Sequence, residues 1–345
     1  MSMDGLLVKL LESYGLSAKN IKRTKGYYII NVGAETFALR KSSERAESLE
    51  FRCRVQKKLL DGGFKNIERL HLTVDGKPFV QRDDQRFILT DYVSGTDVNF
   101  EDKGDLAMLL AALSDFHDKS KGINDAPAEF LSEHLPTRLR KMGLQLKDFA
   151  KRAKGSKNLS EFDMIFLKYY EDYDKCISLA LKILTGTKYD HKLAEAHNIG
   201  SICHNLLKKD TVTIKGGEIM FTSLSNCMVD HFTTDIVMVL SKYMKYDPQR
   251  RIPIMEIIDM YTTNRPQRDD YAIILARLLM PTAFLCAAAE YYVKKRSWVP
   301  SQVTGELMYE VDSREAFFEY IAPLCSYVGA TSEADFNLFP LYRKT

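Results

Sequence analysis

The chain has 345 residues, enough for about two packed domains of ordinary size. Hydrophobic residues make up 45% and charged residues 28%, which is typical of a globular protein and excludes long disordered regions. The 49 basic and 46 acidic residues leave a net charge of only +3, without the clustered basic excess of a nucleic-acid-binding protein. Short basic runs such as 151–154 fit a solvated helix face, so we expect no nucleic-acid partner.

Three features indicate where the chain resides. The six cysteines are scattered without a C-x-x-C pair, which fits free thiols in a reducing cytoplasm. Residues 1–16 are amphipathic and include acids, unlike a signal peptide. The most apolar stretch, 273–289, contains Arg277 and Pro281, which favours a buried helix pair over a membrane span. We therefore expect synthesis in the cytoplasm and no membrane association.

The first third of the chain alternates between helical and β-rich patterns. Leucines between residues 6 and 11 form a helical stripe, and the runs 27–32 and 36–40 predict a β-hairpin. A helix follows and ends at the Gly62-Gly63 pair. Two short strands around the Asp75-Gly76-Lys77 turn lead to a buried strand at 86–95. This part of the chain predicts about five antiparallel strands with one helix.

Beyond Gly95 the pattern becomes mainly helical. Apolar residues at helical spacing mark 106–117, and helical periodicity continues from about 139 to 184. Short β-like runs at 212–214 and 219–221 interrupt it, and helices resume from 235 onward. The layout predicts an α+β protein with a β-rich lobe at 1–94, a hinge near residues 92–95, and a helical lobe at 95–345.

Five short segments, in order, carry a resemblance to a known fold. They are Phe37-Ala38-Leu39-Arg40-Lys41, Ile88 to Gly95, Leu113 to His117, Ile202-Cys203-His204 and Asp230 to Ile236. With their separations they resemble the aminoglycoside-phosphotransferase-like branch of the kinase fold, and within it the spore coat CotS family. The resemblance covers about residues 20–325 and implies the two-lobed kinase-like fold, with the catalytic loop in the helical lobe.

The resemblance also marks where phosphoryl transfer needs its charged groups. Such enzymes use an aspartate as base, an asparagine and an aspartate on Mg²⁺, and a third-strand lysine on the nucleotide phosphates. Here the base position holds Leu206, the metal-binding asparagine position Thr211, and the metal-binding aspartate position Ser223. Arg40 stands at the lysine position and Lys41 follows it. Three of these four positions therefore lack the group that the chemistry requires.

The magnitudes predict loss of catalysis. A positioned general base contributes roughly 10²–10⁴-fold to the rate, and neither leucine nor an uncharged hydroxyl replaces a carboxylate on a cation. The resemblance implies that His204 and Asp235 remain as structural supports of the catalytic loop. Arg40, Lys41, Asp91 and Val93 outline a nucleotide cleft, so binding of ATP without Mg²⁺ stays open, while no cofactor is otherwise expected.

Some residues allow more than one interpretation. Asp210 could replace the lost base, although a solvated loop acid is the simpler interpretation. Cys203, His204, Cys227 and His231 could be assembled into a zinc site, which the expected burial of Cys203 disfavours.

Arg40 could pair with a glutamate on the following helix, Glu47 or Glu50, or both acids could be exposed. His117 fits a core histidine, and the tyrosines at 169–173 fit packing of a helix face.

The resulting hypothesis is a spore-coat-associated, CotS-like pseudokinase that binds or scaffolds without phosphoryl transfer. It would be made in the mother-cell cytoplasm, join other spore coat proteins, and could form a homo-oligomer. The alternative is an ATP-dependent kinase of small molecules such as aminoglycosides or choline, with its catalytic residues relocated.

Overall fold

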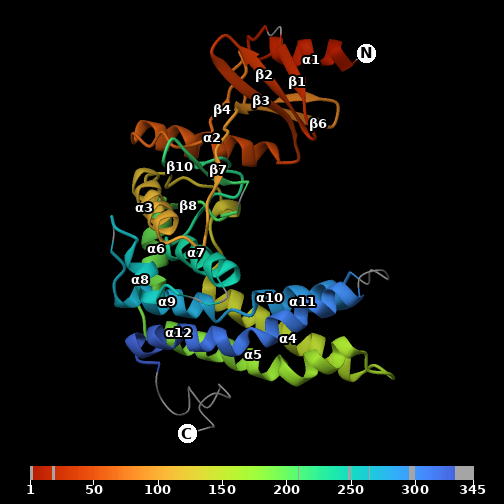
Figure 1. Cartoon of the computed structure of the whole chain (residues 1–345), viewed down its shortest axis with the longest axis vertical. Coiled ribbons are helices and arrows are strands. Elements are labelled where there is room, and N and C mark those ends of the chain that lie inside the picture. The colour runs from red at the N-terminus through yellow and green to blue at the C-terminus, as the bar shows by residue number, and fades with distance from the viewer. Residues whose placement is uncertain are drawn as a thin grey trace. The chain divides into compact units, whose positions relative to one another are not determined.

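The computed structural model describes residues 3–330, except 18–19, 209, 248, 250, 264 and 295–299 (Figure 1). The chain forms two compact units, which are described separately below. The first contains residues 1–131 and 196–235, and the second contains 132–195 and 236–345. The sequence predicted a different division, into lobes at 1–94 and 95–345. The boundary between those lobes stays a prediction.

A six-stranded antiparallel sheet forms the start of the first unit. The expected hairpin is present as β2 and β3, with Val32 opposite Glu35 across the turn. β6 lies on the other side of β3, and the short strands β4 and β5 both pair with β6. The strands are β1 (Asn20–Arg23), β2 (Tyr27–Val32), β3 (Glu35–Ser42), β4 (Leu70–His71), β5 (Val80–Arg82) and β6 (Gln85–Asp91).

The two faces of this sheet have different partners because neighbouring strand residues point to opposite sides. Phe37 and Leu39 of β3 pack with Leu10 of α1 (Met3–Glu12), in one apolar cluster. Ile88 of β6 instead packs with Leu49 of α2 (Ala46–Asp61). The leucine stripe expected at residues 6–11 is α1, so this part of the chain holds two helices, and β1 adds a sixth strand to the five expected.

The rest of the first unit contains the loop after residue 203, which the resemblance identifies as the catalytic loop. Leu106, Leu109, Leu110 and Leu113 of α3 are buried, as the helical spacing predicted. β9 pairs with β10 and β7, and β8 pairs with β11. The elements are β7 (Thr96–Asp97), α3 (Lys103–Lys119), η1 (Ala128–Phe130), β8 (Ile202–Cys203), β9 (Val212–Lys215), β10 (Glu218–Phe221) and β11 (Met228–Val229).

The second unit is helical. Phe166 of α5 stacks on Phe284 of α10 with ring centroids 5.0 Å apart, within a larger group of aromatic side chains. Ser160 and Asp163 form a reciprocal capping box that begins α5. The boundaries between the two units fall within α6 and α7. The helices from residue 135 onward are α4 (Leu135–Lys154), α5 (Glu161–Thr185), α6 (Tyr189–Ile199), α7 (Thr233–Tyr246), α8 (Ile254–Asp259), α9 (Arg268–Leu278), α10 (Thr282–Tyr292), α11 (Pro300–Asp312) and α12 (Arg314–Val328).

The stretch 268–292 is long and apolar enough to cross a membrane by length and composition. In the structure 67% of its most apolar window is buried within the protein, as in a core helix. Pro281 is the N-cap of α10, so the stretch forms two helices, α9 and α10, as the sequence predicted. The absence of a membrane partner stays a prediction.

Candidate functional site

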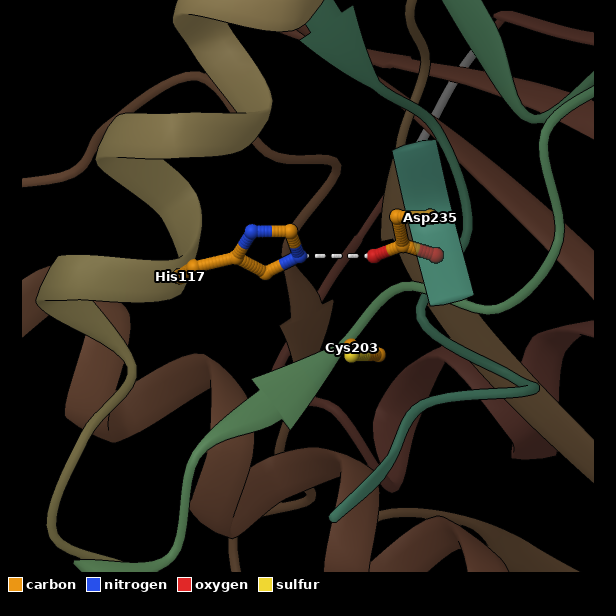
Figure 2. A group of neighbouring side chains, drawn as sticks. All are labelled: His117, Cys203 and Asp235. Atoms are coloured by element: carbon orange, nitrogen blue, oxygen red, sulfur yellow. Dashed lines mark hydrogen bonds and ion pairs between the residues drawn. The ribbon is translucent and has the colours of Figure 1, made fainter. Parts of the chain in front are cut away.

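The carboxylate of Asp235, in the first turn of α7, holds the loop that follows β8. Its Oδ2 accepts the backbone N–H of His204 at 2.7 Å, and its Oδ1 accepts the backbone N–H of Asn205 at 2.8 Å. His117 of α3 places Nε2 2.8 Å from the same Oδ2 (Figure 2). Asn205 has φ of 56°, in the left-handed region that few residues adopt. Asp235 therefore fixes the loop at a strained point of its backbone.

Burial and hydrogen bonding set the charge states of this group. Asp235 is fully buried, which opposes ionisation, but the hydrogen bond from His117 and the loop amides hold the pKa of Asp235 below its usual value. Burial lowers the pKa of His204, whose ring lies 5.0 Å from that of Phe221. His204 is therefore a neutral ring in an aromatic core. This geometry fits the supporting roles that the resemblance implied for His204 and Asp235.

His117, Cys203 and Asp235 also have the composition of a metal site. Their ligand atoms lie within 4.8 Å of one another, and all three residues are buried (Figure 2). However, both Asp235 oxygens accept N–H groups, and the Cys203 thiol lies 3.4 Å from the carbonyl oxygen of His231. Within the described residues this group does not include Cys227 or His231, which the zinc interpretation required. His117 and Asp235 form a hydrogen-bonded support, and the Cys203 thiol donates to backbone carbonyls beside it.

The side chains at the expected base and metal-binding positions do not suit Mg²⁺ binding. Leu206 offers only hydrocarbon. The Thr211 hydroxyl donates to the backbone carbonyl of Leu206 and accepts the backbone N–H of Lys208 at 3.0 Å. The Ser223 hydroxyl donates to Ser225 Oγ at 2.9 Å. These side chains bring no negative charge, and both hydroxyls already have local partners.

Asp210, considered from the sequence as an alternative base, is bonded to a neighbouring lysine. Its side chain is exposed, and its Oδ2 lies 2.9 Å from Nζ of Lys208. Asp230 is buried, but its Oδ1 accepts the backbone N–H of His231 at 2.7 Å, and its Oδ2 accepts the hydroxyl of Thr234. Asp210 therefore matches the solvated loop acid that the sequence favoured.

Arg40 on β3 belongs to a buried ion-pair network that sequence reasoning missed. Its guanidinium pairs with Glu68, and Glu68 also pairs with Arg52 of α2 at 3.3 Å. The hydroxyl of Thr90 donates to Glu68 at 2.9 Å. Burial raises the pKa of Glu68, and the two guanidinium groups oppose that shift. Arg52 could have been found from the sequence, because it follows Leu49 by three residues on the buried face of α2.

The glutamates considered as partners of Arg40 are not its partners. Glu47 and Glu50 are exposed on α2, which agrees with the alternative that both are solvated acids. The Arg40 partner is Glu68, which precedes β4. Lys41 is exposed and, as the next residue of β3, points to the opposite side of the strand from Arg40.

Two of the four residues expected to outline a nucleotide cleft line one pocket. Asp91 and Val93 line a pocket of about 700 Å³ in the first unit, whereas Arg40 and Lys41 are not among its lining residues. Asp91 accepts Nε of Arg69 at 2.8 Å and lies 2.7 Å from Nε2 of His71. The nucleotide cleft formed by all four residues stays a prediction.

The family described as "Spore coat putative kinase YutH" matches residues 8–321 of this chain. The chain is also similar to spore coat protein S of Bacillus subtilis (strain 168), with 21% identity over 280 residues. That similarity covers 78% of this chain and 79% of the relative. Both matches confirm the resemblance to spore coat proteins.

Solved structures confirm the kinase-like α+β fold. An aminoglycoside phosphotransferase from Alicyclobacillus acidocaldarius has a TM-score of 0.77 at 15% identity, over 94% of this chain and 96% of that one. A spectinomycin phosphotransferase in complex with ADP and spectinomycin has a TM-score of 0.62 at 13% identity, over 88% and 93%. A choline kinase from Cryptosporidium parvum has a TM-score of 0.55 at 11% identity, over 94% and 98%. With the family match over residues 8–321, the chain belongs to the spore coat putative kinase family YutH.

Proposed function

We propose that this protein associates with the spore coat as a pseudokinase that binds or scaffolds and does not transfer phosphate. The observation that carries the proposal is the set Leu206, Thr211 and Ser223 at the base and metal positions, with both hydroxyls bonded locally. A Mg²⁺–nucleotide pair needs anionic oxygen ligands, which these three side chains do not provide.

The retained supports favour a scaffolding role. Asp235, His117 and His204 still hold the loop in place, although the loop carries no base. Such groups stabilise the core whether or not catalysis occurs, so they persist when the chemistry is lost. Family membership supports assembly with other spore coat proteins after synthesis in the mother-cell cytoplasm, and a homo-oligomer would suit a coat component.

A second candidate is a small-molecule kinase with relocated catalytic residues. The folds of the aminoglycoside phosphotransferase, the spectinomycin phosphotransferase and the choline kinase favour it. In that case an acid such as Asp210 would have to leave Lys208 and turn to the substrate. A third form of the proposal keeps ATP as a structural ligand without Mg²⁺, held through Arg40 or through Lys41, whose side chains point to opposite sides of β3.

The test combines nucleotide binding with restoration of the lost groups. Melting temperature is measured with ATP, with and without Mg²⁺, and ATP turnover is followed with aminoglycosides and choline. The variant Leu206→Asp/Thr211→Asn/Ser223→Asp carries the three missing groups, and Asp210→Asn removes the alternative base. A fluorescent fusion followed through sporulation tests the coat location separately.

The proposed scaffold gives no Mg²⁺-dependent rise in melting temperature and no turnover in the wild type. In the triple variant Mg²⁺ should begin to raise the melting temperature with ATP, because two carboxylates and an amide are now available. Turnover by the wild type that disappears in Asp210→Asn would overturn the proposal in favour of the relocated kinase. A rise in melting temperature with ATP alone, unchanged by Mg²⁺, would indicate that ATP is bound as a structural ligand.

A further inference from the structure

The pocket of about 700 Å³ lies in the first unit, among four segments that are distant in sequence. The turn between β2 and β3 and the start of β3 form one side. The loop between α2 and β4, residues 91–93, and the β9–β10 hairpin form the others. Its size is that of a small-molecule site.

The pocket is lined from both faces of the sheet, since Thr36 of β3 and Leu60 of α2 lie on the side of Arg40. Phe37 and Asp91 are direct partners across β3 and β6, and both line the pocket. Ala38 and Thr90 are the next pair, and they point to the other face because side chains alternate along a strand. Arg40 shares that other face and bonds Thr90 at 3.0 Å. Arg40 is not among the lining residues, so the pocket does not include the side chain proposed to hold phosphates.

Backbone hydrogen bonds fix the walls of the pocket. Phe221 of β10 donates to the carbonyl of Asn66 at 2.9 Å and accepts from the N–H of Glu68 at 2.7 Å. Tyr92 donates to the carbonyl of Thr36 at 2.9 Å, which ties the segment after β6 to β3. A pocket whose walls are bonded in this way is already formed before a ligand enters, so little ordering opposes binding.

The charges around the pocket favour an anion. Asp91 is bonded to Arg69 and His71, which hold the pKa of Asp91 low and compensate its charge. Lys65 and Lys215 also line the pocket, are exposed, and have no ion-pair partner within the part of the chain that the structure describes. Glu35 is the other acid in the lining, so three basic side chains stand against two acidic ones.

The remaining lining supplies an apolar surface from Phe37, Leu60, Ile67, Val93 and Met220. We propose that this pocket binds a small molecule with an apolar body and an anionic group, the anion contacting Lys65 and Lys215. A charged hydrogen bond to an ammonium group is stronger than a neutral one, so the anion would fix the orientation of the ligand. This inference does not depend on whether the chain transfers phosphate.

Anilinonaphthalene sulfonate, an aromatic sulfonate whose fluorescence reports binding, is the probe that tests the proposal. The full chain is titrated as wild type and as Lys65→Gln/Lys215→Gln. The matched control is Lys22→Gln/Lys25→Gln, which removes the same charge from exposed positions outside the pocket. Octanoate, octanol and ATP are then added as competitors to the wild-type complex.

We expect the Lys65→Gln/Lys215→Gln variant to bind the probe about tenfold more weakly, and the control to stay within about twofold of the wild type. Octanoate should displace the probe, whereas octanol and ATP should not. Equal affinity in all three proteins would overturn the proposal. Displacement by octanol would show that the anion is not recognised, and displacement by ATP would make the pocket part of a nucleotide site; either result would also overturn it.

Discussion

His117 and Asp235 are separated by 118 positions in sequence, yet His117 Nε2 lies 2.8 Å from Asp235 Oδ2 (Figure 2). An ionised carboxylate can only accept, so Nε2 carries the proton and donates it. The same oxygen accepts the N–H of His204, so one atom joins α3, α7 and the loop after β8. Asp235 therefore holds the loop through contacts that do not involve the side chain at position 206.

Replacing Asp235 should therefore destabilise the fold. Asp235→Ala leaves the buried N–H groups of His204, Asn205 and His117 without their acceptor, so we expect a loss of about 3 kcal/mol or more in the free energy of unfolding. Urea unfolding measures it. Asp210→Ala, at an exposed acid, should change stability by less than about 0.5 kcal/mol. Equal losses in the two variants would contradict the support role.

The buried ring of His204 predicts a pH-dependent stability. Its pKa is lowered from 6.5 by burial, so the unfolded chain takes up a proton near that pH while the folded chain does not. Folding stability should therefore fall as pH drops through about 6.5, by up to about 1.4 kcal/mol per pH unit for each proton bound only on unfolding. His197, whose pKa burial also lowers, adds to the same trend.

Urea unfolding across this pH range measures the slope in the wild type and in His204→Gln. The variant should show a shallower slope, because one group that binds a proton only on unfolding has been removed. His197→Gln serves as the comparison for the half-buried histidine. A slope unchanged in His204→Gln would show that another group titrates.

Removing the Glu68 carboxylate should lower folding stability, whereas removing an exposed acid of α2 should not. Arg52 and Glu68 are 3% and 5% exposed, so Glu68→Ala removes the carboxylate that Arg40 and Arg52 share. Breaking one partner of a buried pair typically costs about 3–5 kcal/mol. Glu47→Ala, on the exposed face of the same helix, should cost less than about 0.5 kcal/mol.

The double variant Arg52→Met/Glu68→Leu separates pairing from packing in this network. Apolar side chains of similar size in place of a buried ion pair often restore or increase stability. We therefore expect the double variant to be more stable than Glu68→Ala. If it is equally unstable, the loss reflects packing around the helix and not an uncompensated charge.

Much of the fold could be predicted because local patterns specify it. The alternating runs on either side of the Gly33-Ala34-Glu35 turn became β2 and β3, and the leucine spacing of α3 buried the expected face. The sequence indicated helical periodicity from 139 to 184 and did not show where one helix ends and the next begins. In the structure it divides into α4 and α5, where Gly155 ends one helix and Ser160 caps the next.

Partner choice between distant segments could not be predicted in the same way. The sequence suggested Glu47 or Glu50 for Arg40 because they are close along the chain, but the pairing of β4 with β6 brings Glu68 beside Thr90 and Arg40. Asp91 and Arg40 were expected in one cleft, yet strand alternation puts their side chains on opposite faces. Both outcomes depend on the register of the sheet, which no single segment reveals.

The cysteines offer a prediction that tests the packing of the chain directly. Cys286 is exposed and Cys53 half-buried, whereas Cys176, Cys203, Cys227 and Cys325 are buried, and none forms a disulfide among the described residues. Burial raises the pKa of Cys53 to about 11 and that of Cys176 to about 12, which suppresses the reactive thiolate. A thiol reagent near neutral pH should therefore modify one cysteine, Cys286, rapidly in the native protein.

Stopped-flow labelling of Cys286→Ser should lack this fast phase, whereas Cys53→Ser should retain it. After unfolding in urea, all six thiols of the wild type should react. A fast phase that persists in Cys286→Ser would mean that a cysteine described as buried reaches solvent. If that cysteine were Cys203, the group around Asp235 would open in solution, and the loop would lack the rigid support inferred for it.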